Sequence, residues 1–308
     1  MNIDIKFFKD IYKEDVIYHY TKASTAIDFI LYNEQLKFNE GRKSNDPIES
    51  RKARRGTVYM GSEVDEPITK ENALDSNYLN KYISCLENQF HQICFCKNHI
   101  GKDFASEHYL CNFSGHEEIF GFTKFRMWEQ YADNYAGVCI AFSKKKILAL
   151  NDNKNNLLKD DIDYLTFREL SEKKMGDVNG NLLSSLGRDK YKEQIEENVK
   201  KSFFYKHKDY AGENEYRLGT LYDKKKCCVE HIRGELVFDK TMMLNVSGCI
   251  EAIFISSYLN DRQKKDLLEY ANNLEVSIIE MNWKYDSFEP RDYRKRVALV
   301  DIMTKEIS

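Results

Sequence analysis

The chain lacks the segments that would carry it into or across a membrane. No apolar run approaches the roughly 18 residues of a membrane-spanning helix, and the first ten residues hold no apolar signal core. An excess of charge of one sign is missing too: 47 lysines and arginines stand against 50 aspartates and glutamates. The net charge of -3 therefore gives no indication of a nucleic-acid partner. We expect a cytoplasmic protein without a membrane partner.

Cysteine spacing typical of structural zinc is also missing. None of the eight cysteines belongs to a Cys-x2-Cys pair. One stretch is still rich in candidate ligands: His91, Cys94, Cys96, His99, His108, Cys111 and His116. Cys94 and Cys96 alternate in an apparent strand, which favours buried, reduced thiols over a metal site. We expect no metal.

Only three prolines interrupt the chain, and its 42% hydrophobic content is typical of a globular protein. The apolar runs that predict strands lie near residues 16–21, 92–96, 137–142, 249–256 and 276–281. Helical periodicity between them predicts a single α+β domain over residues 1–308. Its central sheet is expected to be mixed and mainly antiparallel, with flanking helices. The charged residues 143–204 are predicted to form a helical insertion or lid, and residues 61–80 a polar loop.

The most informative stretch is residues 206–217, Lys-His-Lys-Asp-Tyr-Ala-Gly-Glu-Asn-Glu-Tyr-Arg. Glu213, Glu215 and Arg217 stand at alternate positions, so a strand would project all three from one face. Two carboxylates and a guanidinium on one face cost stability unless they pair or meet a ligand. Two interpretations stay open: Arg217 is the counter-ion in a structural network, in the plainest case an exposed ladder of ion pairs, or the row forms one wall of a functional site.

Other positions carry candidate chemistry, each with a plainer alternative. His19 lies in the predicted first strand and is either a hydrogen-bonded core histidine or a donor in a site. Asn45 and Asp46 belong to a turn-forming sequence, so Asp46 either caps a turn or binds a ligand. Trp128 is either a core residue or a platform on which a ligand stacks.

Five motifs together carry a family resemblance. They are Tyr18-His19-Tyr20-Thr21, Asn45-Asp46-Pro47-Ile48-Glu49, Met127-Trp128 with Tyr131-Ala132, the run from Gly137 to Phe142, and Lys206 through Glu213-x-Glu215-x-Arg217. In this order and spacing they resemble the bacterial family called domain of unknown function 2971, over about residues 16–260. The resemblance implies kinship and names no activity.

The first strand, helix and short second strand are also similar, more distantly, to the opening of ADP-ribosyltransferase folds. That resemblance implies NAD as substrate, a first-strand histidine on the ribose, and a late Glu-x-Glu motif. Here these positions are His19 and Glu213-x-Glu215, with Trp128 or Tyr131 to stack on nicotinamide. The Ser-Thr-Ser element of one transferase branch is absent.

The same resemblance implies a division of roles. Glu215 would stabilise the oxocarbenium-like centre formed as the nicotinamide–ribose bond breaks, and Glu213 would orient or deprotonate an acceptor. Arg217 would either bind pyrophosphate or hold Glu215 in place, and Lys206 and Lys208 would contact phosphate. The ligand pocket would be shaped by Tyr20, Thr21, Asn45, Asp46, Trp128 and Tyr131. Such an enzyme would act as a toxin or an anti-phage effector.

Two other functional classes stay open. A metal-dependent nuclease would hold Mg²⁺ with Asp46, Glu213 and Glu215. A non-catalytic module of a defence system would bind a nucleotide or a foreign protein in an aromatic pocket. Metal dependence separates the nuclease from NAD chemistry, because only the latter should persist in EDTA.

Overall fold

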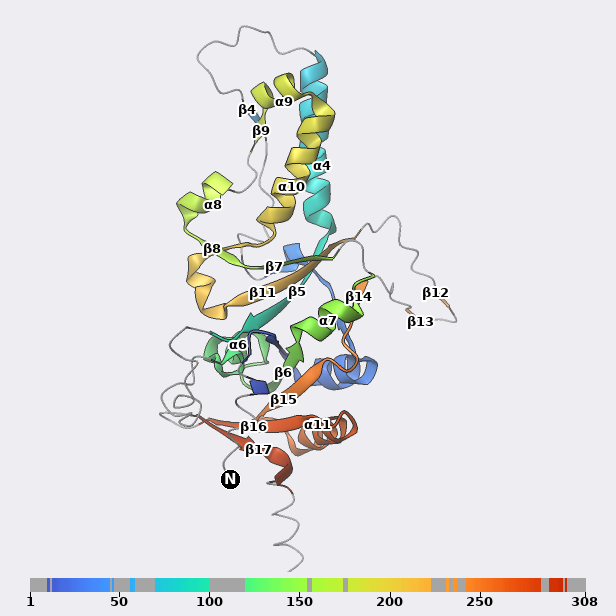
Figure 1. The fold of residues 1–308 in the computed structure, drawn as a ribbon, viewed down its shortest axis with the longest axis vertical. Coiled ribbons are helices and arrows are strands. Elements are labelled where there is room, and N and C mark those ends of the chain that lie inside the picture. The colour runs from blue at the N-terminus through green and yellow to red at the C-terminus, as the bar shows by residue number, and fades with distance from the viewer. Residues whose placement is uncertain are drawn as a thin grey trace, which may run out of the picture.

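Figure 1 shows the protein, a computed structural model of residues 1–308. The structure describes residues 10–11, 13–44, 46, 56–58, 70–99, 120–153, 157–173, 177–222, 231–232, 235–236, 242–283, 288–295 and 297.

One mixed sheet forms the centre of the molecule, in the order β17-β16-β15-β6-β1-β5-β11-β7, with β3 also paired to β5. Neighbouring strands are antiparallel except β15 and β16, which are parallel and connected through α11. The strands are β1 (Val16–Lys22), β3 (Asn39–Glu40), β5 (Phe90–Lys97), β6 (Gly137–Ser143), β7 (Leu158–Asp161), β11 (Glu215–Leu221), β15 (Ile250–Ser256), β16 (Ser277–Trp283) and β17 (Phe288–Asp292). The predicted α+β class with a mainly antiparallel sheet is confirmed.

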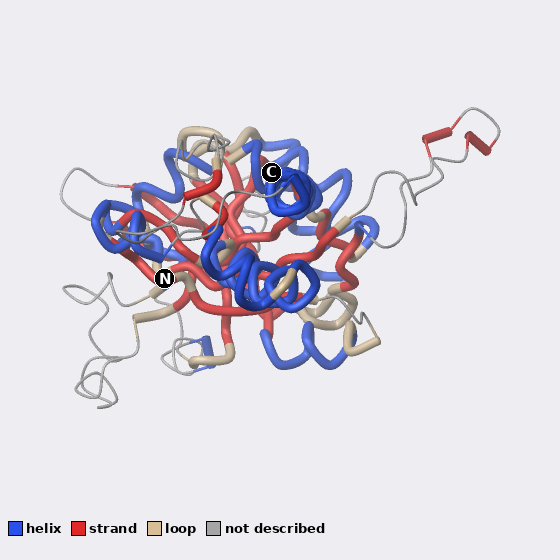
Figure 2. Tube along the Cα trace, turned by 90° about the horizontal axis from the view of Figure 1, so that it is seen from above, coloured by secondary structure: helices blue, strands red, loops and turns tan. Residues whose placement is uncertain are grey.

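Helices surround this sheet when it is viewed from above (Figure 2). They are α2 (Ala23–Thr25), η1 (Ala26–Leu31), η2 (Gly41–Lys43), α4 (Lys70–Gln89), η4 (Gly121–Thr123), α6 (Phe125–Tyr131), α7 (Lys144–Leu150), α8 (Phe167–Lys173), α9 (Gly180–Leu186), α10 (Arg188–Ser202), η5 (Lys208–Glu213) and α11 (Asp261–Asn273). None of the helices in the described part of the chain has the length and apolar character needed to cross a bilayer.

Four short strand pairs lie outside the central sheet. They are β2 (Gln35–Lys37) with β14 (Met243–Asn245), β8 (Asp163–Leu165) with β10 (Tyr205–His207), β4 (Thr57–Val58) with β9 (Val178–Asn179), and β12 (His231–Ile232) with β13 (Glu235–Leu236). The pairing of β8 with β10 matters most for the site, because it places Lys206 beside the end of β11.

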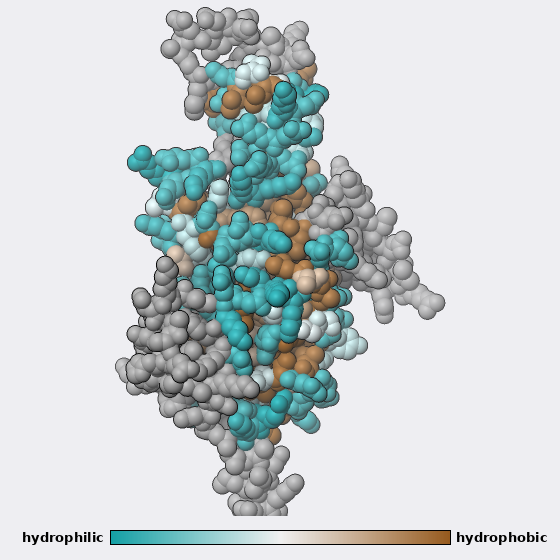
Figure 3. Space-filling view, in the orientation of Figure 1, coloured by the Kyte–Doolittle hydropathy of each residue, from teal (hydrophilic) through white to brown (hydrophobic). Residues whose placement is uncertain are grey.

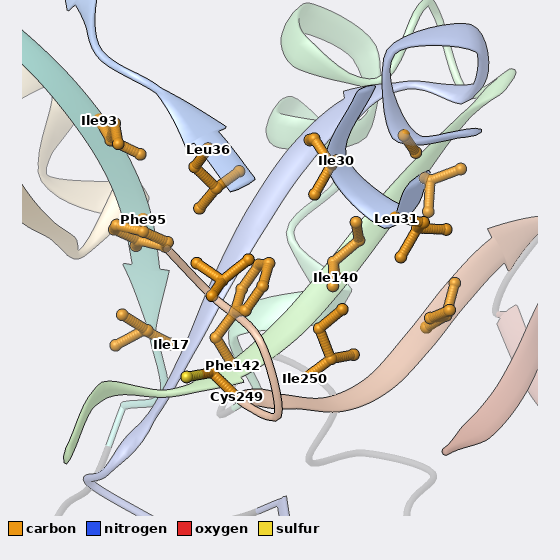
Figure 4. Close-up of a cluster of buried hydrophobic side chains, with 14 of the residues drawn as sticks. Ile17, Ile30, Leu31, Leu36, Ile93, Phe95, Ile140, Phe142, Cys249 and Ile250 are labelled. Carbon is orange, nitrogen blue, oxygen red and sulfur yellow. The ribbon is translucent and has the colours of Figure 1, made fainter. Parts of the chain in front are cut away.

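Alternation along the strands divides the core into two layers. Ile17, Phe95 and Ile140 lie in one layer with Ile30 and Leu31 of η1 (Figure 4). Buried side chains of α11 belong to the same layer. Tyr18 lies in the opposite layer, where Trp128 of α6 is also buried. The successive residues Ile17 and Tyr18 thus face different layers, as a period of two requires.

An arm projects from one end of the sheet, built from α4 and α10 with α9 at its far end (Figure 1). It has a hydrophobic cluster of its own, with Leu79 and Ile83 packed against residues of α9 and α10. The prediction of a polar loop over residues 61–80 is wrong from Lys70 onward, because Leu79 and Ile83 lie on the buried side of α4. Apolar side chains also gather on the surface of α9 (Figure 3).

Residues 143–204, predicted as a helical insertion, contain α7 to α10 but are not helical throughout. Their strand β7 pairs with β11 and forms one edge of the central sheet. This segment therefore supplies both most of the arm and a part of the sheet.

Candidate functional site

The site begins with an interruption in strand pairing along β5. One edge of β5 pairs with β11 from Phe90 to Cys96. The other edge is divided: β1 pairs with it only at Cys96 and Lys97, and β3 only at His91 and Gln92. Between these two pairings β1 diverges from β5. A cavity of about 730 Å³ opens there, in the size range of small-molecule sites, and residues of β1, β3, β5, η2 and α6 line it.

His19 takes over the hydrogen bonding of β5 at this interruption. Its Nδ1 lies 3.0 Å from the carbonyl oxygen of Cys94. A carbonyl oxygen only accepts, so Nδ1 carries the proton and Nε2 is left as an acceptor. Burial lowers the pKa of His19, against the opposing effect of the bond to Cys94, and so favours the neutral ring. His19 also lines the cavity.

Four buried charges form a network at the cavity wall. The Nζ atom of Lys206 lies 2.6 Å from Oε2 of Glu213 and 3.2 Å from Oε2 of Glu215. Nε of Arg217 donates to Oε1 of Glu215 at 2.7 Å, and its Nη1 donates to the carbonyl of Phe203 at 2.6 Å. The side chains of the four charged residues are only 2–4% exposed, so the interpretation as an exposed ladder of ion pairs is wrong.

Glu213 does not belong to the strand that holds Glu215 and Arg217, contrary to the prediction from alternation. It ends the 3-10 helix η5, and Asn214 follows in the left-handed region, with φ 46° and ψ 58°. The strand β11 begins only at Glu215. Period two therefore explains the contact between Glu215 and Arg217, whereas Glu213 is brought alongside by the turn at Asn214. The side-chain amide of Asn214 secures the turn by donating to the carbonyl of Asn98 at 2.9 Å.

The two carboxylates have pKa values shifted in opposite directions. Burial raises the pKa of Glu213, and Lys206 only partly opposes it. Burial acts on Glu215 as well, but the charges of Arg217 and Lys206 outweigh it and lower the pKa to about 2. One carboxylate is thus held ionised while its neighbour can exchange a proton closer to neutral pH, an arrangement typical of acid–base sites.

Aromatic and hydroxyl side chains complete the inner part of the cavity. Tyr20, Thr21 and Tyr131 line it together with His19. The hydroxyl of Tyr131 lies 3.5 Å from Oε1 of Glu213, and burial raises its pKa, so it remains a protonated donor at neutral pH. These residues come from β1 and α6, which the fold brings to the same end of β11.

Some predicted ligand-binding residues do not line the cavity. Trp128 is fully buried, donates from Nε1 to the carbonyl of Phe122 at 2.8 Å, and packs edge-on behind Tyr20. Arg217 lies behind Glu215, and Asp46 is buried outside the cavity lining. Asn45 lies outside the described residues.

The cysteine-rich stretch forms no metal cluster within the part of the chain that the structure describes. Cys94 and Cys96 are free thiols there; Cys96 is buried, as expected, whereas Cys94 is partly exposed. Both cysteines line the cavity, and burial raises the pKa of Cys96 far above its ordinary value. Of the remaining candidates, His108, Cys111 and His116 lie outside the described residues.

Several cavity residues could not be found from the sequence. Three lysines, Lys22, Lys37 and Lys43, line the cavity, as do Glu40 and Tyr222. They come from β1, β2, η2, β3 and the end of β11. No motif connects them, and each looks like an ordinary surface residue until the strands are paired.

Comparison with known proteins bears on the central part of the chain. Residues 127–218 match the model of a family described as "Protein of unknown function (DUF2971)". This segment runs from α6 to β11 and includes Lys206, Glu213 and Glu215. The predicted family resemblance is therefore confirmed over a shorter range than residues 16–260. No curated protein and no solved structure matches the chain.

Proposed function

We propose that the protein consumes NAD⁺ as an ADP-ribosyltransferase-like enzyme, by cleaving the bond between nicotinamide and ribose. The supporting observation is the convergence of His19, Glu213 and Glu215 on one cavity, although the first strand and a much later segment supply them. A likeness in sequence order alone would not require these side chains to meet. The cavity also offers Tyr20 and Tyr131 as aromatic surfaces for a flat ring.

The proposed chemistry assigns different roles to the two carboxylates. The bond from ribose C1′ to the ring nitrogen breaks, its electron pair leaves with nicotinamide, and C1′ gains positive character. Glu215, held ionised by Arg217 and Lys206, stabilises that charge. Water, the simplest acceptor, then adds to C1′ and gives up a proton. Glu213, with its raised pKa, accepts the proton.

The nuclease alternative requires a rearrangement of the same residues. A divalent cation between Glu213 and Glu215 would have to displace the ammonium group of Lys206, which contacts both carboxylates. Asp46, its expected third ligand, does not line the cavity. These contacts favour a metal-independent reaction over phosphodiester hydrolysis by bound Mg²⁺. The binding-module alternative uses the same cavity and is distinguished by turnover.

The test is release of nicotinamide from NAD⁺ by the purified protein in EDTA, followed by chromatography. Glu215→Gln keeps the shape of the side chain but removes the charge that stabilises C1′. We expect it to lower the rate by about 100-fold or more, the usual effect of removing one transition-state-stabilising group.

The matched control is Glu280→Gln. Glu280 is buried in β16, pairs with Lys264 at 2.9 Å, and does not line the cavity. Removing one partner of a buried pair costs about 3–5 kcal/mol of stability in either variant. Equal losses of activity in the two variants would show a stability effect and contradict the role of Glu215. Tight binding of NAD⁺ without turnover by the wild type would support a binding module instead.

A further inference from the structure

The cations expected to contact phosphate are engaged elsewhere. Lys206 contacts Glu213 and Glu215, and Arg217 is bound to Glu215 and to the carbonyl of Phe203. Moving either cation to a phosphate would leave a buried carboxylate without its partner, which is strongly unfavourable. A phosphorylated ligand therefore needs positive charge from another part of the cavity.

Three lysines that line the same cavity have no part in this network. Lys22 ends β1, Lys37 ends β2, and Lys43 ends the 3-10 helix η2. Thr25 and Ser44, which follow Lys22 and Lys43 closely in the sequence, also line the cavity and offer hydroxyl donors. Three segments that are separate in the chain thus present ammonium and hydroxyl donors to one opening.

Lys22 and Lys43 each make an ion pair in which the lysine side chain is exposed. Lys22 lies 3.6 Å from Asp133, with both side chains more than half exposed. Lys43 is 73% exposed and lies 3.3 Å from Glu40, which also pairs with Arg42 at 3.1 Å. Pairs of this kind contribute little and rearrange readily. The described residues that line the cavity outside the Lys206 network include three lysines and one carboxylate, that of Glu40.

We propose that Lys22, Lys37 and Lys43 form a subsite for the phosphate groups of a nucleotide. This inference rests on the proposed function, which identifies the end of the ligand that reacts. It also predicts the direction in which the ligand lies in the cavity. The reacting carbon lies inward at Glu215, and the phosphates lie at the lysines. The substrate class is accordingly a nucleoside diphosphate joined to a second group, and the uncharged nucleoside lacks what this subsite recognises.

The test is titration calorimetry with ADP-ribose, which keeps the phosphates of NAD⁺ but has no nicotinamide to release. Adenosine serves as the uncharged probe. For Lys37→Gln/Lys43→Gln we expect affinity for ADP-ribose to fall about tenfold or more, because charge-assisted bonds are lost. Affinity for adenosine should not change, and the wild-type affinity for ADP-ribose should fall as salt is raised.

The control is Lys201→Gln, which removes an exposed lysine of α10 that pairs with Glu197 at 2.7 Å and lies outside the cavity lining. Equal affinities of the wild type and the double variant for ADP-ribose would overturn the subsite, as would failure of the wild type to bind it. Lysine-dependent binding without release of nicotinamide would support the subsite and reject the proposed function. Release of nicotinamide without lysine-dependent binding would support the proposed function and reject the subsite.

Discussion

Individual residues differ in how far the sequence could identify them. Alternation predicts that Glu215 and Arg217 share a face, and their 2.7 Å contact agrees. The sequence could not show that Lys206 contacts both glutamates, because this contact depends on the pairing of β10 with β8. Trp128 illustrates the reverse error: a large aromatic near the site proves to be buried behind Tyr20.

The charge state of Glu215 predicts a pH-dependent difference in stability. Its pKa is lowered to about 2 in the folded protein, so ionised Glu215 stabilises the fold above the ordinary carboxyl pKa. This contribution is lost as pH falls from about 4.5 toward 2. Glu215→Gln lacks it at every pH. We expect the wild type to exceed the variant in unfolding free energy by about 3–5 kcal/mol at pH 7 and by much less at pH 3.

Urea denaturation of both proteins at the two pH values measures this difference. A difference that stayed constant from pH 7 to pH 3 would show that Glu215 is not held ionised by Arg217 and Lys206.

Among the elements, those with a continuous apolar run were predicted best. The runs that form β6 and β15 are continuous and apolar, and both are central strands. The helix α4 was missed because its mean composition is polar, although Leu79, Ile83 and Leu86 recur at helical spacing on its buried side. The turn between η5 and β11 was missed because Asn214, unlike glycine, gives no strong signal of a left-handed conformation.

Asn214 offers a test of how this turn positions Glu213. In Asn214→Ala the hydrogen bonds to the carbonyls of Lys97 and Asn98 are lost, and alanine must adopt the left-handed conformation. We expect a loss of about 2 kcal/mol in unfolding free energy. Asn214→Gly loses the same bonds without the conformational cost, so it should be less destabilised. Denaturant titration compares the two, and a glycine variant less stable than the alanine variant would contradict this account.

At the scale of the whole molecule, composition and pattern predicted the α+β class and the mainly antiparallel sheet. They could not predict that one edge of β5 is divided between β1 and β3, since that depends on which strands become neighbours. The cavity exists because of this division. Glu213, Glu215 and the three lysines that line it come from segments that are far apart in the sequence.

The most direct measurement is a crystal structure with carba-NAD⁺, an analogue in which the ribose ring oxygen is replaced by carbon so that the nicotinamide bond is not cleaved. The account predicts that the carbon bearing nicotinamide lies beside the carboxylate of Glu215, with the diphosphate directed toward Lys37 and Lys43. A ligand bound in the opposite direction, or outside the cavity beside β5, would contradict it.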